Sequence, residues 1–298
     1  MAGPRNLVPP PTFTDRNYGL LSVVQARYDE PDAHWRNGVT FQDICGLGGL
    51  TYDPCAVSGT PTAKAANVEI ETYGALPFTV FGEVDCSPVG YSQEDQRARA
   101  VDALTRNESW QVERAFWTGT VSTGVLYPHL AANAAVTDSL GVTLQCAATT
   151  VTGSTVLDVV EGIARLESAM AGCYNGQFVI HVPTILGPQL FQWGIVDTYG
   201  GQIKTKTGNL VALGAGYPGT GPTGAAIDNA VWVYATPPVF AYRSSPETFT
   251  FKEMLDRTDN TVQSIVERTY VLGFPCCCFY ALPISVGGDI TGQPLSAF

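Results

Sequence analysis

The stretch 93–118 constrains the fold most, because its residues indicate one uninterrupted helix. Ser92 is a favourable N-cap, Glu94 and Asp95 place carboxylates in the first turn, and Gly119 is typical of the position just beyond a helix end. At 1.5 Å per residue this helix would be about 39 Å long, well above the usual length in globular proteins. One side is expected to pack, and the rest to stay solvated or to meet partners.

Apolar and charged residues divide along this predicted helix. The apolar set that can form one stripe is Val101, Leu104, Ala115 and Phe116. The charged set that is expected to keep the other faces polar is Arg97, Arg106, Glu113 and Arg114.

Upstream of the helix the sequence indicates an arm, a hairpin and a strand. Residues 1–45 show no sustained period and read as an extended arm that packs on a neighbour, or as an ordered tail. Alternating residues around 68–73 and a turn-rich segment before them predict a long hairpin over 46–77. A second strand is expected over 78–84.

Downstream, helix and strand signals alternate in a compact α+β unit. A helix is expected after Ser154 and Thr155, with apolar residues Val156, Val159, Val160, Ile163, Leu166 and Met170. A short helix should begin at Pro183 and run through Leu186, Leu190, Phe191 and Trp193. Strands are predicted over 177–182, 210–213, 231–234, 239–242, 261–272 and 276–284.

The chain is short of charge and acidic. Charged residues make up 14% of it, against roughly 25% in an ordinary soluble domain, and only eleven lie between residues 120 and 250. Charge depletion marks the core of interfaces, so much of this surface is expected to face other protein. The net charge of −11 argues against direct nucleic-acid binding and suits a container that holds DNA without gripping it. No apolar run is long enough to span a membrane.

The eight cysteines carry no metal-binding pattern. They are far apart except for Cys276, Cys277 and Cys278, and no CxxC pair occurs. The start of the chain has no secretory apolar segment, so reduced thiols in the cytosol are expected. We interpret the cysteines as small buried hydrophobic residues, with the adjacent three inside a strand, rather than as metal ligands.

No motif predicts catalysis, a cofactor or a metal. The three histidines are His34, His129 and His181, and none has metal-ligand spacing. His181 lies in an apolar strand and reads as a core or interface histidine. The glycine-rich segments 46–50 and 214–224 lack phosphate-loop spacing and read as flexible turns.

Two segments resemble a known family. The segment 81–120, with Val112, Glu113 and the run Phe116–Gly119, resembles the major capsid proteins of actinobacterial tailed phages, and 260–284 looks like their returning strands. The resemblance implies a Hong Kong 97-type α+β capsid fold. It implies an N-terminal arm at 1–45, an E-loop at 46–77, a P-domain at 78–130 and 256–275 with the spine helix at about 93–118, and an A-domain with a terminal strand at 131–255 and 276–298.

The resemblance also implies partners and a place. Family members assemble as pentamers and hexamers into an icosahedral virion shell around double-stranded DNA, in the host bacterial cytoplasm. The partners would be a portal, a scaffolding protein and, as in some members, decoration proteins. The scaffolding protein would be a separate chain, because no charged helical segment precedes the arm. Some members crosslink through an E-loop lysine, for which Lys64 is the candidate, although a solvated loop lysine is the simpler reading.

Two other functions remain open on the sequence. An encapsulin, which is a bacterial compartment with the same fold around a cargo enzyme, would share these features. A soluble α+β enzyme with an unrecognised site is the alternative from another class.

Overall fold

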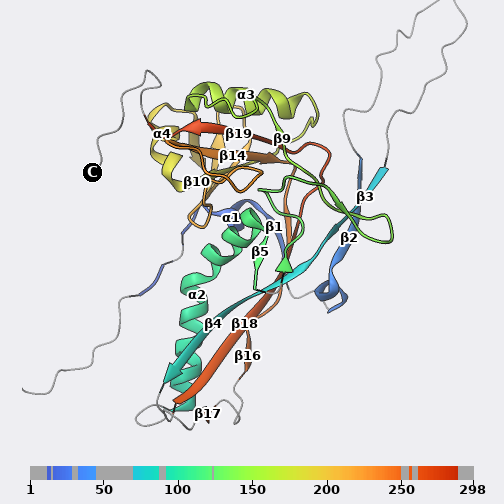
Figure 1. Cartoon of the computed structure of the whole chain (residues 1–298). Coiled ribbons are helices and arrows are strands. Elements are labelled where there is room, and N and C mark those ends of the chain that lie inside the picture. Colours follow the sequence, from blue (N-terminus) through green and yellow to red (C-terminus); the bar gives the residue numbers. More distant parts are fainter. Residues whose placement is uncertain are drawn as a thin grey trace, which may run out of the picture.

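The computed structural model describes residues 12–14, 16–28, 33–44, 70–86, 92–122, 124–249, 255–256 and 261–287. Figure 1 shows an elongated lower part, in which one long helix lies beside long strands, and a compact upper part with a sheet and two helices. The helices are α1 (Leu20–Val23), η1 (Ala33–Asn37), α2 (Gln93–Thr118), α3 (Val159–Ala171), η2 (Thr184–Leu186) and α4 (Gly187–Gln192). None of the described helices is both long enough and apolar enough to cross a membrane.

The described strands form four sheets. The first half of the chain provides β1 (Gln25–Tyr28), β2 (Val39–Ile44), β3 (Ile70–Ala75), β4 (Pro77–Cys86), β5 (Thr120–Val121), β6 (Gly124–Val125), β7 (Val136–Thr137), β8 (Thr143–Gln145) and β9 (Thr149–Thr150). The second half provides β10 (Val179–Pro183), β11 (Val196–Tyr199), β12 (Gln202–Thr205), β13 (Leu210–Gly214), β14 (Ala230–Thr236), β15 (Phe240–Arg243), β16 (Glu247–Phe249), β17 (Leu255–Asp256), β18 (Thr261–Gly273) and β19 (Tyr280–Ser285).

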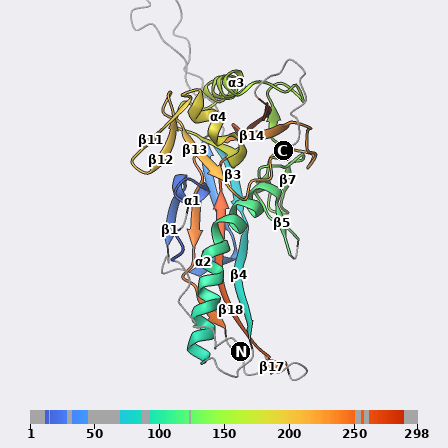
Figure 2. The same cartoon turned by 90° about the vertical axis from the view of Figure 1, so that its left-hand side faces the viewer.

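Strand β18 is the centre of the lower sheet. It pairs antiparallel with β4 from Val262 opposite Cys86 to Val271 opposite Pro77. Its other edge pairs in turn with β17, β16 and β15. The two turned views agree that α2 runs along this pair of strands (Figure 2). The helix comes close enough that a Cβ on Gly82 would lie 2.7 Å from the Ala100 carbonyl oxygen.

The long helix confirms the sequence prediction at both ends. The Ser92 side chain accepts a hydrogen bond from the Asp95 amide at 3.1 Å, and Asp95 Oδ2 accepts one from the Ser92 amide at 3.1 Å. Gly119 ends the helix with φ +69°, a left-handed conformation that glycine adopts without strain. The predicted faces were partly wrong: Val101 is 39% exposed, whereas Glu113 is only 2% exposed.

The upper sheet has seven strands in the order β11-β12-β13-β10-β14-β19-β9. Helix α3 lies across it (Figure 1) and buries Ile163, Leu166 and Met170 in the same apolar cluster as β10, β14 and β19. The helix begins at Val159 and not directly after Ser154 and Thr155, and the carboxylate of its N-cap Asp158 accepts hydrogen bonds from the Val160 and Glu161 amides. The predicted start was too early, because Asp158 caps the first turn by accepting hydrogen bonds from two of its amides.

Three other expectations differ from the structure. Strand β2 lies inside the segment expected to be an aperiodic arm and pairs with β3 from Val39–Ala75 to Ile44–Ile70; the predicted hairpin residues 46–69 lie outside the described ranges. The last strand begins at Tyr280, so Cys276–Cys278 form a turn and not a strand. The β11–β12 hairpin was not predicted, because its strands are short and half exposed.

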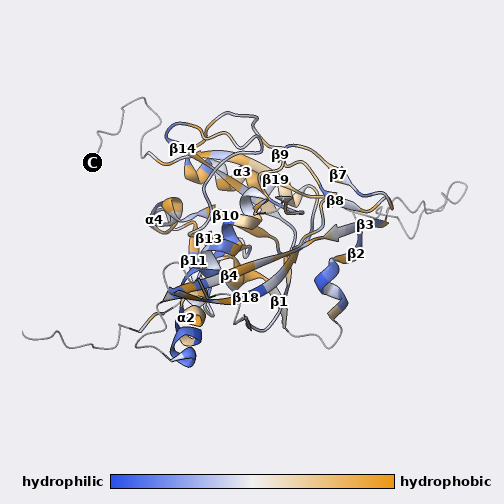
Figure 3. Ribbon diagram, turned by 60° about the horizontal axis from the view of Figure 1, so that its bottom comes forward, coloured by the Kyte–Doolittle hydropathy of each residue, from blue (hydrophilic) through white to orange (hydrophobic). Residues whose placement is uncertain are grey.

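Figure 3 shows that hydrophobic residues gather on the upper sheet and that hydrophilic residues are frequent along α2. Two apolar clusters form the main cores. One lies between α2, β4, β18 and the underside of the upper sheet, and the other lies between the upper sheet and α3 and α4. The α+β class that the sequence predicted is therefore confirmed, with α2 joining the two parts.

Candidate functional site

The described residues contain no group of three or more histidine, cysteine or acidic side chains that could hold a metal ion. The polar groups that the fold does bring together lie under the long helix. They are charged or uncharged side chains that hydrogen-bond one another or the backbone, and each joins elements far apart in the sequence. We describe them in turn, from the histidine to the two glutamates.

His181 is a core histidine, as expected. Its Nδ1 lies 3.1 Å from the Tyr217 hydroxyl and its Nε2 lies 3.0 Å from Thr236 Oγ1, and its side chain is fully buried. Burial lowers the pKa of His181 to about 3, so the ring is neutral. Both ring nitrogens are bound to hydroxyl groups of the core, which suits a structural role.

Glu108 links α2 to the central strand of the lower sheet. Its carboxylate accepts hydrogen bonds from Arg268 Nη1 at 2.7 and 2.8 Å and from the Tyr270 hydroxyl at 2.5 Å, both on β18. Arg243 Nη2 on β15 donates a further bond at 2.9 Å. The carboxylate is 9% exposed, and the arginines 14% and 23%. Because the Glu108 carboxylate is buried, replacing Glu108 would remove the negative charge that faces both arginines.

Glu113 links α2 to two other segments. Oε1 accepts a hydrogen bond from the Leu20 amide at 3.0 Å, and Oε2 accepts one from the Gly216 amide at 2.8 Å. Burial raises the pKa of the Glu113 carboxyl, while the bonds from Gly216 and Leu20 act in the opposite direction. Only glycine fits at position 216, because a Cβ there would lie 2.9 Å from the Arg114 amide nitrogen. The carboxylate thus holds α1 and the loop after β13 against the same turn of α2.

The glycine-rich loop 214–224 is packed and not a flexible turn. Trp117 Nε1 on α2 donates to both oxygens of Thr220 at 3.1 Å, and the Tyr234 hydroxyl donates to the Thr220 carbonyl at 3.0 Å. Tyr217 is 5% exposed and its ring lies 4.9 Å from that of Trp117. The prediction was wrong because glycine here permits close approach to α2. The other segment, 46–50, lies outside the described residues.

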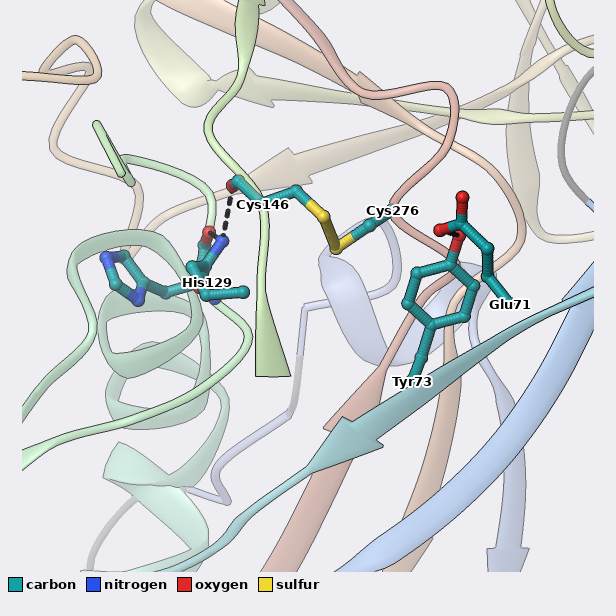
Figure 4. The surroundings of a disulfide bond; sticks show 6 residues. Glu71, Tyr73, His129, Cys146 and Cys276 are labelled. Atoms are coloured by element: carbon teal, nitrogen blue, oxygen red, sulfur yellow. Dashed lines mark hydrogen bonds between the residues drawn. A yellow bond between two sulfur atoms is a disulfide. The ribbon is translucent and has the colours of Figure 1, made fainter. Parts of the chain in front are cut away.

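The cysteines correct the sequence interpretation. Cys146 is bonded to Cys276, and Cys173 is bonded to Cys278, with Cα–Cα distances of 5.7 and 5.8 Å. Figure 4 shows the first bond beside the ring of Tyr73, whose hydroxyl donates to Glu71 at 2.8 Å. The expectation of separate packed thiols fails because the turn between β18 and β19 brings the cysteine run against partners more than a hundred residues earlier.

Large apolar side chains remain exposed on both parts of the subunit. On the upper part, Ile185 is 58% and Trp193 64% exposed. On the lower part, Phe81 of β4 is 45% and Trp110 of α2 46% exposed. Among the described strands, β4 pairs with β18 alone, so its second edge is available along ten residues. Exposed aromatic groups and an unpaired edge are typical of protein contact surfaces.

Sequence reasoning missed Glu108 and Glu113, although a signal was present. Residues at every fourth position of α2 are buried, and Glu108 is one of them: Gln96, Ala100, Leu104, Glu108, Val112 and Phe116. A buried glutamate in that series needs a cationic partner, and Arg268 of the predicted strand 261–272 is a candidate. The crosslink candidate Lys64 lies outside the described residues.

No family model and no curated protein matches the sequence. Solved structures do match the fold. The capsid of the native GTA particle has a TM-score of 0.56 at 9% identity and is covered to 95% in both chains. The capsid of Ralstonia phage GP4 has a TM-score of 0.54 at 10% identity, over 97% of this chain and 96% of that one.

An encapsulin has the same likeness. The holo-SrpI encapsulin complex from Synechococcus elongatus PCC 7942 has a TM-score of 0.56 at 10% identity, over 98% of this chain and 96% of that one. The chain therefore has the Hong Kong 97-type capsid fold over nearly its whole length, as the resemblance implied.

Proposed function

We propose that the protein is the major capsid subunit of a tailed bacteriophage, which assembles with copies of itself into an icosahedral shell around double-stranded DNA. One observation carries the proposal: the chain shares its whole fold, with 95% coverage in both directions, with the capsid of a GTA particle. A single shared domain could serve many functions, but a match over nearly the whole of both chains favours the same use. The proposed role is structural, and no step of it needs catalysis.

Charge supports a container. The net charge of −11 is opposite in sign to what phosphate binding needs, and the scarcity of charge between residues 120 and 250 suits surface that meets other subunits. The exposed Trp193 and Phe81 and the unpaired edge of β4 provide contact surface. Many modest contacts of this kind would add up over a closed shell.

We assign the parts of the subunit by the resemblance. Residues 1–45 would be the arm and 46–77 the E-loop, which reach neighbouring subunits. Residues 78–130 and 256–275 would form the P-domain, and 131–255 with 276–298 the A-domain. Glu108 and Glu113 would hold α2 in a fixed position relative to β18, the arm segment α1 and the loop after β13 when neighbouring subunits bind.

We propose the same partners for the shell as the resemblance implies. Pentamers and hexamers of this chain would close with a portal and a separate scaffolding protein, in the host bacterial cytoplasm. Lys64 would be the lysine of any covalent crosslink between subunits. Electrophoresis of denatured, reduced shells tests this point, because a crosslink gives a ladder that Lys64→Arg abolishes, whereas monomer alone would refute it.

Size exclusion followed by negative-stain electron microscopy of the purified protein tests the main proposal. Closed shells or ring-shaped capsomers are expected. A uniform particle of monomer or dimer size, under all conditions that favour assembly, would overturn the proposal and favour an enzyme. The polar side chains described above support the capsid proposal, because they form hydrogen bonds within the subunit.

The encapsulin-like match favours one alternative, a nanocompartment that encloses a cargo enzyme. The contents of purified particles separate the two. Nuclease-resistant double-stranded DNA inside the shells supports the phage capsid, whereas a co-purifying enzyme inside DNA-free shells supports the compartment. The neighbouring genes give a second reading, since a portal and terminase accompany a phage capsid.

A further inference from the structure

The turn between β18 and β19 is where the lower sheet passes into the upper sheet. It contains Cys276, which is 8% exposed, and Cys278, which is 1% exposed. Phe274 of the same turn is buried, with its ring 5.9 Å from that of Phe116 on α2 and 5.2 Å from that of Phe279. The turn is therefore held in the core and not at the surface.

Cys276 and Cys278 are bonded to partners from two different elements. Cys146 directly follows β8, and Cys173 lies just beyond the end of α3. The sequence separations are 130 and 105 residues, and both Cα–Cα distances lie in the range of native disulfides. The Cys173 sulfur also lies 3.4 Å from the Cys277 carbonyl oxygen, so α3's end meets the backbone of the turn as well.

We propose that these four cysteines are oxidation sites, and that their two disulfides make the turn a covalent junction between the lower sheet, the β8 segment and α3. Closing loops of more than a hundred residues restricts the unfolded chain strongly. The junction also deepens the proposed function and rests on it, because force on the lower sheet would reach the upper part through disulfide bonds as well as through packed side chains.

The oxidation balances with a small-molecule disulfide, RSSR, as the oxidant. One cysteine thiolate attacks RSSR and releases RS⁻, which gives a mixed disulfide on the protein. The second thiolate then attacks the protein sulfur of that mixed disulfide and releases the other RS⁻. Two protein thiols lose two protons and two electrons, and RSSR is reduced to two RSH. Burial of Cys276 and Cys278 then protects the bonds from the reverse reaction in the folded state.

Peptide mapping tests the bonding directly. The protein is alkylated with N-ethylmaleimide in urea without reductant and digested with trypsin. Cleavage after Arg114, Arg165, Lys204 and Arg268 gives peptides 115–165, 166–204 and 269–298, which hold Cys146, Cys173 and the cysteine run. A linked species that contains at least these three peptides, and that reduction separates, is expected. Three separate peptides with alkylated cysteines would overturn the proposal.

Thermal melting of variants tests the junction. Cys173→Ala and Cys278→Ala each break the same bond, so each single variant and the double variant should all melt lower than the parent by a similar amount, on the order of 10 °C. Thiols that merely pack would instead give a double variant that melts lower than either single variant. The same cycle with Cys146 and Cys276 provides a second, independent comparison.

These measurements test the disulfide junction independently of the capsid proposal. Only the mechanical role of the junction rests on that proposal. Linked peptides in a protein that never assembles would support the disulfides and overturn the capsid proposal. Shells built from chains with alkylated, unlinked peptides would support the capsid proposal and overturn the junction.

Discussion

Arg268 Nη1 lies 2.7 Å from Glu108 Oε1, and this contact joins the middle of the long helix to the central strand of the lower sheet. The two residues are 160 positions apart in the sequence. Tyr270 and Arg243 also donate to the carboxylate, so a single side chain of α2 contacts two strands.

We expect Glu108→Ala to lower the free energy of unfolding by about 3–5 kcal/mol, because it removes the buried carboxylate that faces two largely buried guanidinium groups. Urea unfolding measures this change. Asp102→Ala is the matched control, since Asp102 is on the same helix but its pair with Arg106 is exposed, at 52% and 38%. That variant should change stability by less than about 1 kcal/mol. Equal effects of both would mean that the buried cluster stabilises no more than a surface pair.

Glu113 should give the protein a pH-dependent stability. Its pKa is raised in the folded state, so its contribution is complete below the usual value of 4.5 and is lost as pH rises through the raised pKa. Glu113→Gln keeps the shape but cannot ionise. The difference in unfolding free energy between parent and variant should therefore change across the acid range up to neutral pH. A constant difference across that range would contradict the raised pKa.

Gly82 allows the helix to approach the sheet. A Cβ at this position would lie 2.7 Å from the Ala100 carbonyl oxygen and from the Leu104 Cα, so Gly82→Ala should cost at least about 1–3 kcal/mol. Gly172→Ala is the control. It has a right-handed conformation with nothing nearer than 3.5 Å, and it should be neutral or stabilise by about 0.4–1 kcal/mol. Similar losses in both would show that α2 can move aside freely.

Trp193 should matter for assembly and not for folding. It is 64% exposed, so Trp193→Ser should leave the unfolding free energy within about 0.5 kcal/mol while reducing the yield of particles. Gln192→Ser changes the adjacent exposed residue and should reduce neither. Sedimentation of assembly reactions measures the yield. Unchanged assembly in the tryptophan variant would place this surface outside the subunit contacts.

Much of the fold could be predicted because local signals agreed with it. The Ser92 cap and the Gly119 stop defined α2 to the residue, and continuous apolar runs marked β10, β14 and β18. The β11–β12 hairpin was missed, since its short strands show no clear alternation. Strand β2 was missed because it pairs with residues that follow a long intervening segment, and no local pattern records that pairing.

The polar anchors and the disulfides could not be predicted in the same way. Glu108 and Glu113 look like surface residues until their partners on β18 and in the loop after β13 are known. Eight cysteines allow 105 complete pairings, so the sequence alone cannot select Cys146–Cys276 or Cys173–Cys278. Both failures concern contacts between residues far apart in the chain.

The pairing of β4 with β18 also determines the order of events during synthesis. Gln263 donates to Glu83 across a separation of 180 residues, so the ribosome releases α2 and β4 long before their central strand exists. During that interval the buried stripe of α2 has no complete sheet to cover it, and the loop that must close is long. The core of the lower part is therefore completed only after β18 has been synthesised, near the end of the chain.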